Sequence, residues 1–168
     1  MSIPLPDNPF AVLTLIAAPA VFTNASSVLA LGTGNRLARV VDRTRELGRE
    51  LRTAAHEDKE VEQMWHHQLN RLDRRGGLLV RAMSFFYTSI GAFAATSLVS
   101  ILGASLAGSS YSLPFAVISG ISFVLGSVGF VGLSFGCTLL VRETRLALQS
   151  HFEEARLVRS RFKQTGQD

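Results

Sequence analysis

Residues 82–141 contain no Asp, Glu, Lys or Arg across sixty positions. A transmembrane helix needs about 20 apolar residues to cross a hydrocarbon core of roughly 30 Å. A soluble hairpin of this size would carry charges on its outer face, because helices that are apolar all round lie in membranes or deep cores. A single turn-like stretch at 108–113 interrupts the run. The run therefore predicts two antiparallel crossings, 83–107 and 114–141, joined by an outer loop at 108–113.

Cysteine is almost absent as well. The single cysteine, Cys137, lies in an apolar run, which excludes a disulfide framework and a zinc site built on paired cysteines. The sequence has no HExxH motif, and its crossings hold no Asp, Glu, Lys, Arg or His, which proton relays and intramembrane catalysts normally need. We therefore expect no catalytic residues, no metal and no cofactor, and we do not expect an enzyme.

A second uncharged run covers residues 8–35 and predicts a first crossing at 10–34, preceded by a short outer tail at 1–9. A signal peptide is the competing interpretation, but the basic leading region is missing and the apolar stretch is too long. Steps of three and four residues place small and polar side chains on one face of this helix. The members of this polar face are Ala17, Ala20, Thr23, Asn24, Ser27 and Leu31.

The segment 35–82 is highly charged and predicts a cytosolic helical hairpin that continues the first two crossings. Apolar or small residues recur along its first arm with coiled-coil-like spacing, at Leu37, Val40, Thr44, Leu47, Leu51 and Ala54. This seam would bury little area in a lone monomer, so it predicts a homo-oligomer. Gly76 and Gly77 suggest a hinge near the membrane surface.

The third predicted crossing is rich in glycine. Gly129, Gly132 and Gly136 lie close to one face, and small residues on such a face let membrane helices pack closely. Residues 142–168 are charged again and predict a cytosolic C-terminal helix and tail.

The distribution of basic residues predicts the orientation. All 17 Lys and Arg residues lie in 36–81 and 142–168, and none lies in the predicted outer tail or outer loop. Basic segments next to crossings face the cytoplasm, so we expect the N-terminus outside and the C-terminus inside. This rule also accounts for the net charge of +4 without a nucleic-acid partner. The sequence thus predicts an all-α integral membrane protein with three transmembrane helices.

Three stretches of the chain resemble a bacterial membrane-protein family catalogued as a domain of unknown function, number 2721. They are 29–47 (LALGTGNRLARVVDRTREL), 71–75 (RLDRR) and 140–148 (LVRETRLAL). The resemblance covers roughly residues 10–150 and implies a three-helix protein of the bacterial inner membrane. It implies no reaction, cofactor or catalytic residue.

Two functions remain open at this stage. The polar face of the first helix can line a channel for small ions if five or more subunits form a ring. Arg36, Arg39 and Arg43 would then stand at the cytoplasmic mouth, although contact with lipid phosphates explains them equally well. Packing inside the three-helix bundle, with Asn24 bonded to a neighbour, is the competing explanation of the polar face. The alternative function is a non-conducting scaffold or small subunit that docks a cytosolic partner on the 36–80 hairpin.

Overall fold

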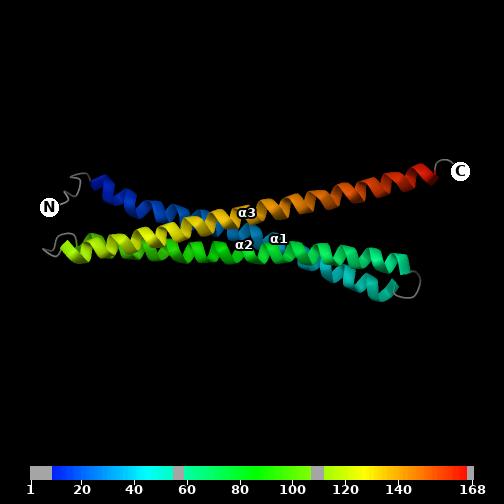
Figure 1. Cartoon of the computed structure of the whole chain (residues 1–168), viewed down its shortest axis with the longest axis horizontal. Helices are drawn as coiled ribbons and strands as arrows, with labels where there is room; N and C mark the ends of the chain where they lie inside the picture. The colour runs from blue at the N-terminus through cyan, green and yellow to red at the C-terminus, as the bar shows by residue number, and fades with distance from the viewer. Residues whose placement is uncertain (1–8, 55–58, 107–111, 166–168) are drawn as a thin grey trace. The chain divides into compact units, whose positions relative to one another are not determined.

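The computed structural model describes residues 9–54, 59–106 and 112–165, and all of them are α-helical. Each stretch is a single helix: α1 is Pro9–Ala54, α2 is Lys59–Leu106 and α3 is Ser112–Thr165 (Figure 1). The all-α prediction is confirmed. Pro9 already belongs to α1, and Ser112 and Leu113 belong to α3. The remainder of the predicted outer tail and outer loop lies outside the described residues.

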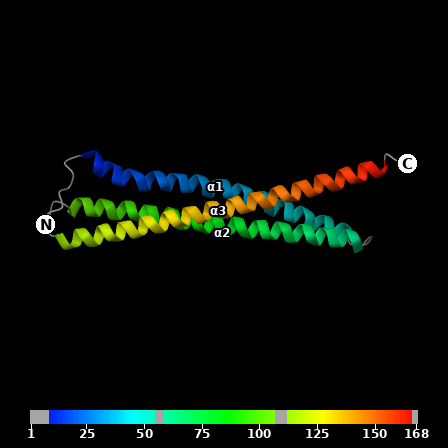
Figure 2. The same ribbon diagram turned by 45° about the horizontal axis from the view of Figure 1, so that its top comes forward.

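The three helices are much longer than a bilayer requires. They contain 46, 48 and 54 residues, which corresponds to roughly 70–80 Å at 1.5 Å per residue. Each helix can therefore combine one crossing with a charged arm. The helix α2 runs through Gly76 and Gly77 without a break (Figure 2), so the hinge suggested there does not divide it into two helices and stays a prediction.

The chain divides into two compact units, and every helix contributes to both. The first unit is Met1–Gly32 with Met83–Gly136, and the second is Thr33–Ala82 with Cys137–Asp168. All Lys and Arg residues belong to the second unit. The boundaries between the two compact units therefore lie close to the boundaries between the uncharged and the charged parts of the sequence.

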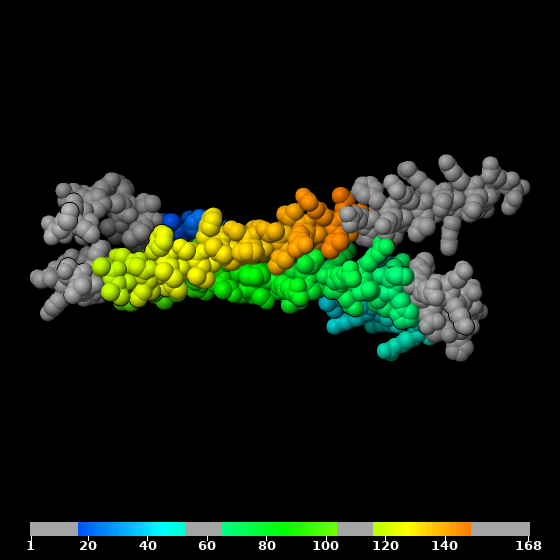
Figure 3. All heavy atoms as spheres, viewed as in Figure 1, coloured from blue at the N-terminus to red at the C-terminus, as the bar shows by residue number. Residues whose placement is uncertain are grey.

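In the part of the chain whose side chains the structure describes, two helical segments are long and apolar enough to cross a membrane: Trp65–Gly103 in α2, with a mean hydropathy of 1.6, and Ala116–Leu148 in α3, with 2.0. Only 28% and 11% of their most apolar stretches are buried within the chain. Figure 3 shows side chains of α3 on the surface of the molecule. Large apolar residues of α3 are among the exposed ones, with Phe123 at 77% exposure. A core helix of a soluble protein would be mostly buried, so this exposure is typical of a surface that faces lipid.

Glycines of α3 pack directly against α2 in the first unit. A Cβ atom on Gly129 would lie 2.8 Å from the ring of Phe93, and one on Gly136 would lie 2.5 Å from the ring of Phe86. A Cβ on Gly132 would lie 2.7 Å from the hydroxyl of Ser89. The partner numbers fall as the glycine numbers rise, as expected for antiparallel helices. The absent side chains at 129, 132 and 136 therefore provide the space that α2 occupies.

Phe22 joins α1 to the same core. Its ring stacks on Phe93 of α2 with centroids 5.3 Å apart and meets Phe130 of α3 edge-on at 6.2 Å. Aromatic pairs at such distances add to the burial of their area. One side chain of α1 thus contacts both other helices.

Several hydroxyl groups are buried in the first unit, and two of them bond to their own helix. Ser89 donates to the carbonyl of Phe85 and Thr96 donates to the carbonyl of Ala92, both at 2.8 Å. Bonding to the carbonyl four residues earlier satisfies a hydroxyl without water, which suits a hydrocarbon environment.

Two residues of the predicted coiled-coil seam are buried within the chain. Val40 and Leu47 are buried, and a Cβ on Gly76 of α2 would lie 3.8 Å from Val40. Leu37, Thr44 and Leu51 are half-buried, while the side chain of Ala54 lies outside the described set. Part of the seam is therefore buried within one chain, and the inference from it to a homo-oligomer stays a prediction.

Candidate functional site

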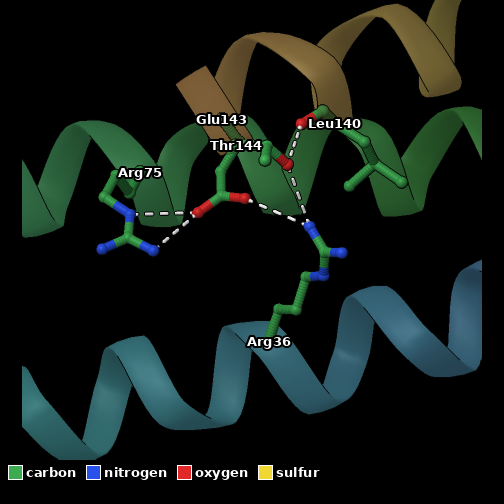
Figure 4. A network of polar contacts seen from close by, with 5 residues as sticks. All are labelled: Arg36, Arg75, Leu140, Glu143 and Thr144. Carbon is green, nitrogen blue, oxygen red and sulfur yellow. Dashed lines mark hydrogen bonds and ion pairs between the residues drawn. The ribbon is translucent and has the colours of Figure 1, made fainter. Parts of the chain in front are cut away.

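The second unit brings one charged residue from each helix to one place. Arg36 comes from α1, Arg75 from α2 and Glu143 from α3 (Figure 4). Arg36 and Glu143 lie just after the uncharged runs of their helices, and Arg75 lies shortly before that of α2. The packing of the three helices encloses Glu143, whose side chain is only 4% exposed.

Arg75 is the main partner of the buried carboxylate. Its Nε and Nη2 atoms both donate to Oε1 of Glu143, at 3.0 and 2.8 Å. The Arg75 side chain is itself only 22% exposed. A buried carboxylate is tolerated only when it is paired and hydrogen-bonded, and two charge-assisted bonds from one guanidinium meet that requirement.

Arg36 contacts the other side of the same carboxylate less closely. Its Nη1 lies 3.5 Å from Oε2 of Glu143 and donates a hydrogen bond to Oγ1 of Thr144 at 3.1 Å. Thr144 in turn donates to the carbonyl of Leu140 at 2.9 Å (Figure 4). The Arg36 side chain is 50% exposed. Arg36 is therefore held in place by two oxygen atoms while part of its guanidinium faces solvent.

These residues border a cleft of about 350 Å³ in the second unit. Arg39 and Arg43 also line it, so four arginines face one carboxylate. Arg43 is paired with Glu46. Arg39 has no acidic partner in the described part of the chain. The lining is strongly positive, so its chemistry suits an anion.

The structure brings together the three arginines that the sequence singled out, and it adds two residues that sequence reasoning missed. Arg36, Arg39 and Arg43 all line the cleft, whereas Arg75 and Glu143 were not expected there. A signal was available: Arg36 is the first charge after one uncharged run, and Glu143 is the second after the other. Charges at corresponding ends of neighbouring helices are natural candidates for pairing.

The polar face of α1 belongs to the first unit and points away from its core. Ala17, Ala20, Asn24 and Ser27 are exposed, Leu31 is 69% exposed and Thr23 is half-buried. Thr23 donates to the carbonyl of Pro19 and Ser27 donates to the carbonyl of Thr23, each at 2.9 Å. Asn24 makes no hydrogen bond with any residue that the structure describes. The core side of α1 is formed instead by Pro19, Ser26 and Ala30.

Fold and site together define an all-helical protein with an arginine-rich helical unit and, among the described residues, two helical segments that are long and apolar enough to cross a membrane. The chain belongs to the DUF2721 family of proteins of unknown function, and the match covers residues 16–151. The predicted family is therefore confirmed. No curated protein and no solved structure matches the chain.

The network falls on the stretches that carry the family resemblance. Arg36 lies in 29–47, Arg75 lies in 71–75 and Glu143 lies in 140–148. The three stretches are far apart in sequence, and the second unit joins them through one carboxylate.

Proposed function

We propose that the protein is a homo-oligomeric channel for small ions in the bacterial inner membrane, with three crossings per subunit and the polar face of α1 lining the pore. The observation that carries the proposal is the position of Asn24. Its amide is exposed and without a hydrogen-bond partner among the described residues, within a run that has no charge. An unpaired amide in hydrocarbon costs several kcal/mol, so a membrane placement requires that water or another subunit cover it.

The first unit of a single subunit offers an ion no polar path, because the cleft of about 500 Å³ beside Phe22, Phe93 and Phe130 is lined mainly by apolar side chains. Phe22, Phe93 and Phe130 join the helices of the first unit, and α2 fills the space over the glycines of α3. A pore lined by α1 therefore has to form between copies. A ring of five or more subunits can place one Asn24 side chain from each copy around an axis.

Hydrogen bonding within α1 gives its polar face a defined chemistry. Because the hydroxyls of Thr23 and Ser27 donate to backbone carbonyls, their lone pairs remain as acceptors. Acceptor oxygens can replace part of the hydration shell of a cation. We therefore expect conduction of small ions, with the basic segments on the cytoplasmic side and the N-terminus outside.

Ion flux into liposomes that contain the purified protein tests this function. Asn24→Leu should abolish or strongly reduce the flux, and Asn24→Ala should change its rate or selectivity. Ser127→Ala is the matched control, because Ser127 is also exposed but lies on α3 and bonds to the carbonyl of Phe123. Equal flux in all three variants, or a dimeric or trimeric assembly, would refute the pore.

A non-conducting scaffold is the second candidate, and the surface of the 36–80 hairpin favours it. Asp42 and Arg45 are 75% and 72% exposed and only 3.9 Å apart, so both are available to a cytosolic partner. The bonds between Arg75 and Glu143 would keep such a docking surface rigid. A partner that is captured by the full chain but not by the double variant Asp42→Lys and Arg45→Glu, in a protein without ion flux, would establish this function in place of the channel.

A further inference from the structure

We propose that the cleft bordered by Arg36, Arg39 and Arg43 binds the phosphate group of an anionic phospholipid. The proposal rests on the membrane placement argued above but not on conduction. It identifies a ligand site in the second unit, whereas the proposed pore belongs to the first.

The arrangement of the arginines is suited to a phosphate. Arg36, Arg39 and Arg43 are three and four residues apart on α1, so they share one face of the helix, and all three line the cleft. Guanidinium groups bind phosphate oxygens with paired, charge-assisted hydrogen bonds. A single phosphate between Arg36 and Arg39 would meet donors from both side chains.

The buried carboxylate of Glu143 does not neutralise all of the positive charge of these arginines, so part of it is available to a phosphate. Arg75 donates both of its bonds to Oε1 of Glu143, so it supplies most of the neutralisation. Arg36 lies farther from the carboxylate, at 3.5 Å, and is half exposed. Arg39 has no acidic partner among the residues that the structure describes. Even with Arg43 paired to Glu46, the cleft keeps a net positive charge.

The location selects a lipid over a soluble anion. Arg36 is the first charged residue after the uncharged run of α1, and Glu143 follows the uncharged run of α3 by two positions. Phospholipid headgroups lie where such runs end, and basic pockets between helices on the cytoplasmic side bind anionic headgroups.

Native mass spectrometry of the full chain in detergent, titrated with phosphatidylglycerol or phosphatidylcholine, tests the site. The wild-type protein should retain phosphatidylglycerol in preference to phosphatidylcholine. Arg39→Gln should weaken its retention about fivefold, since one arginine near an anionic headgroup contributes about 1 kcal/mol. Phosphatidylcholine retention should stay unchanged.

Arg74→Gln is the matched control. Arg74 is exposed, has no acidic partner in the described residues and does not line the cleft. Its removal deletes the same charge from the same unit, and it should leave phosphatidylglycerol retention within about twofold. Equal losses in Arg39→Gln and Arg74→Gln would overturn the proposal, because they would indicate diffuse attraction to surface charge.

A competition experiment distinguishes a lipid headgroup from free phosphate as the ligand. Inorganic phosphate in large molar excess should not displace phosphatidylglycerol, because it lacks the acyl chains. Displacement would overturn the lipid assignment and make the cleft a site for free phosphate. Failure of the channel is a distinct result: a chain that retains phosphatidylglycerol through Arg39 yet passes no ions keeps the lipid site and loses the pore.

Discussion

Oε1 of Glu143 accepts two hydrogen bonds from the guanidinium group of Arg75, and the two residues lie 68 positions apart in the sequence. This pair fastens the arm of α3 to the arm of α2 within the second unit. Arg36 of α1 contacts the other carboxylate oxygen of Glu143, Oε2. One carboxylate therefore holds three helices together, and it also determines how much positive charge the neighbouring cleft retains.

Removal of the buried carboxylate should destabilise the protein. Glu143→Ala leaves Arg75 largely buried without its partner, and breaking a buried pair in this way costs about 3 kcal/mol. Denaturant unfolding in detergent, followed by circular dichroism, measures the loss. Glu46→Ala is the control, because its pair with Arg43 is exposed and should contribute under about 1 kcal/mol.

The same pair can be tested by exchanging its charges. Arg75→Glu alone should be strongly destabilising, since it places two carboxylates together. The double variant Arg75→Glu with Glu143→Arg should recover part of the loss. If the double variant were no more stable than the sum of its single changes predicts, the pair would not couple the helices.

The close packing of α3 on α2 predicts that a single methyl group is harmful at Gly136. The Cβ of Gly136→Ala would lie 2.5–3.0 Å from three atoms of the Phe86 ring, so the ring or the helix must shift. Overpacking of this kind costs about 1–3 kcal/mol. Gly120→Ala should cost nothing, because nothing lies within 4 Å of its Cβ position. Equal thermal stability of the two variants would contradict the packing.

Leu47 tests whether the seam is filled within one chain. Leu47 is 2% exposed, so Leu47→Ala should lower the free energy of unfolding by about 3 kcal/mol. Val41→Ala, at a position 38% exposed, should have a much smaller effect. The number of subunits, measured by size-exclusion chromatography with light scattering, should stay the same in both variants. A change in subunit number with Leu47→Ala alone would place the seam between copies.

Cysteine accessibility can distinguish a water-lined α1 from a lipid-covered one. In a Cys137→Ser background, Asn24→Cys and Ser27→Cys should react with a membrane-impermeant maleimide, because thiols ionise in water and not in hydrocarbon. Leu98→Cys and Phe123→Cys should not react, although both positions are exposed on the isolated chain, at 65% and 77%. Similar rates at all four positions would argue against a pore on the α1 face.

Composition along the chain was sufficient to predict the all-α fold and the division into an apolar and a charged part. The uncharged run 82–141 and the basic segments beside it carry this information. Charged side chains are costly in hydrocarbon and stable in water, so their distribution along the chain separates the two parts. The glycines at 129, 132 and 136 were likewise identifiable, since close packing requires small residues at helical spacing. Three of the four arginines of the cleft, Arg36, Arg39 and Arg43, were recognisable as basic residues that follow the first uncharged run.

The pairing of those residues was decided only by the tertiary structure. Helical spacing in α1 cannot indicate that Arg36 meets Glu143, because that contact depends on how α1 and α3 are rotated and aligned along their axes. The same rotation turned Val40 and Leu47 toward the chain's own helices and left Asn24 outside. Sequence thus determined which parts of the chain avoid charge, while packing determined which charges meet, because contacts between distant residues depend on the relative register of whole helices.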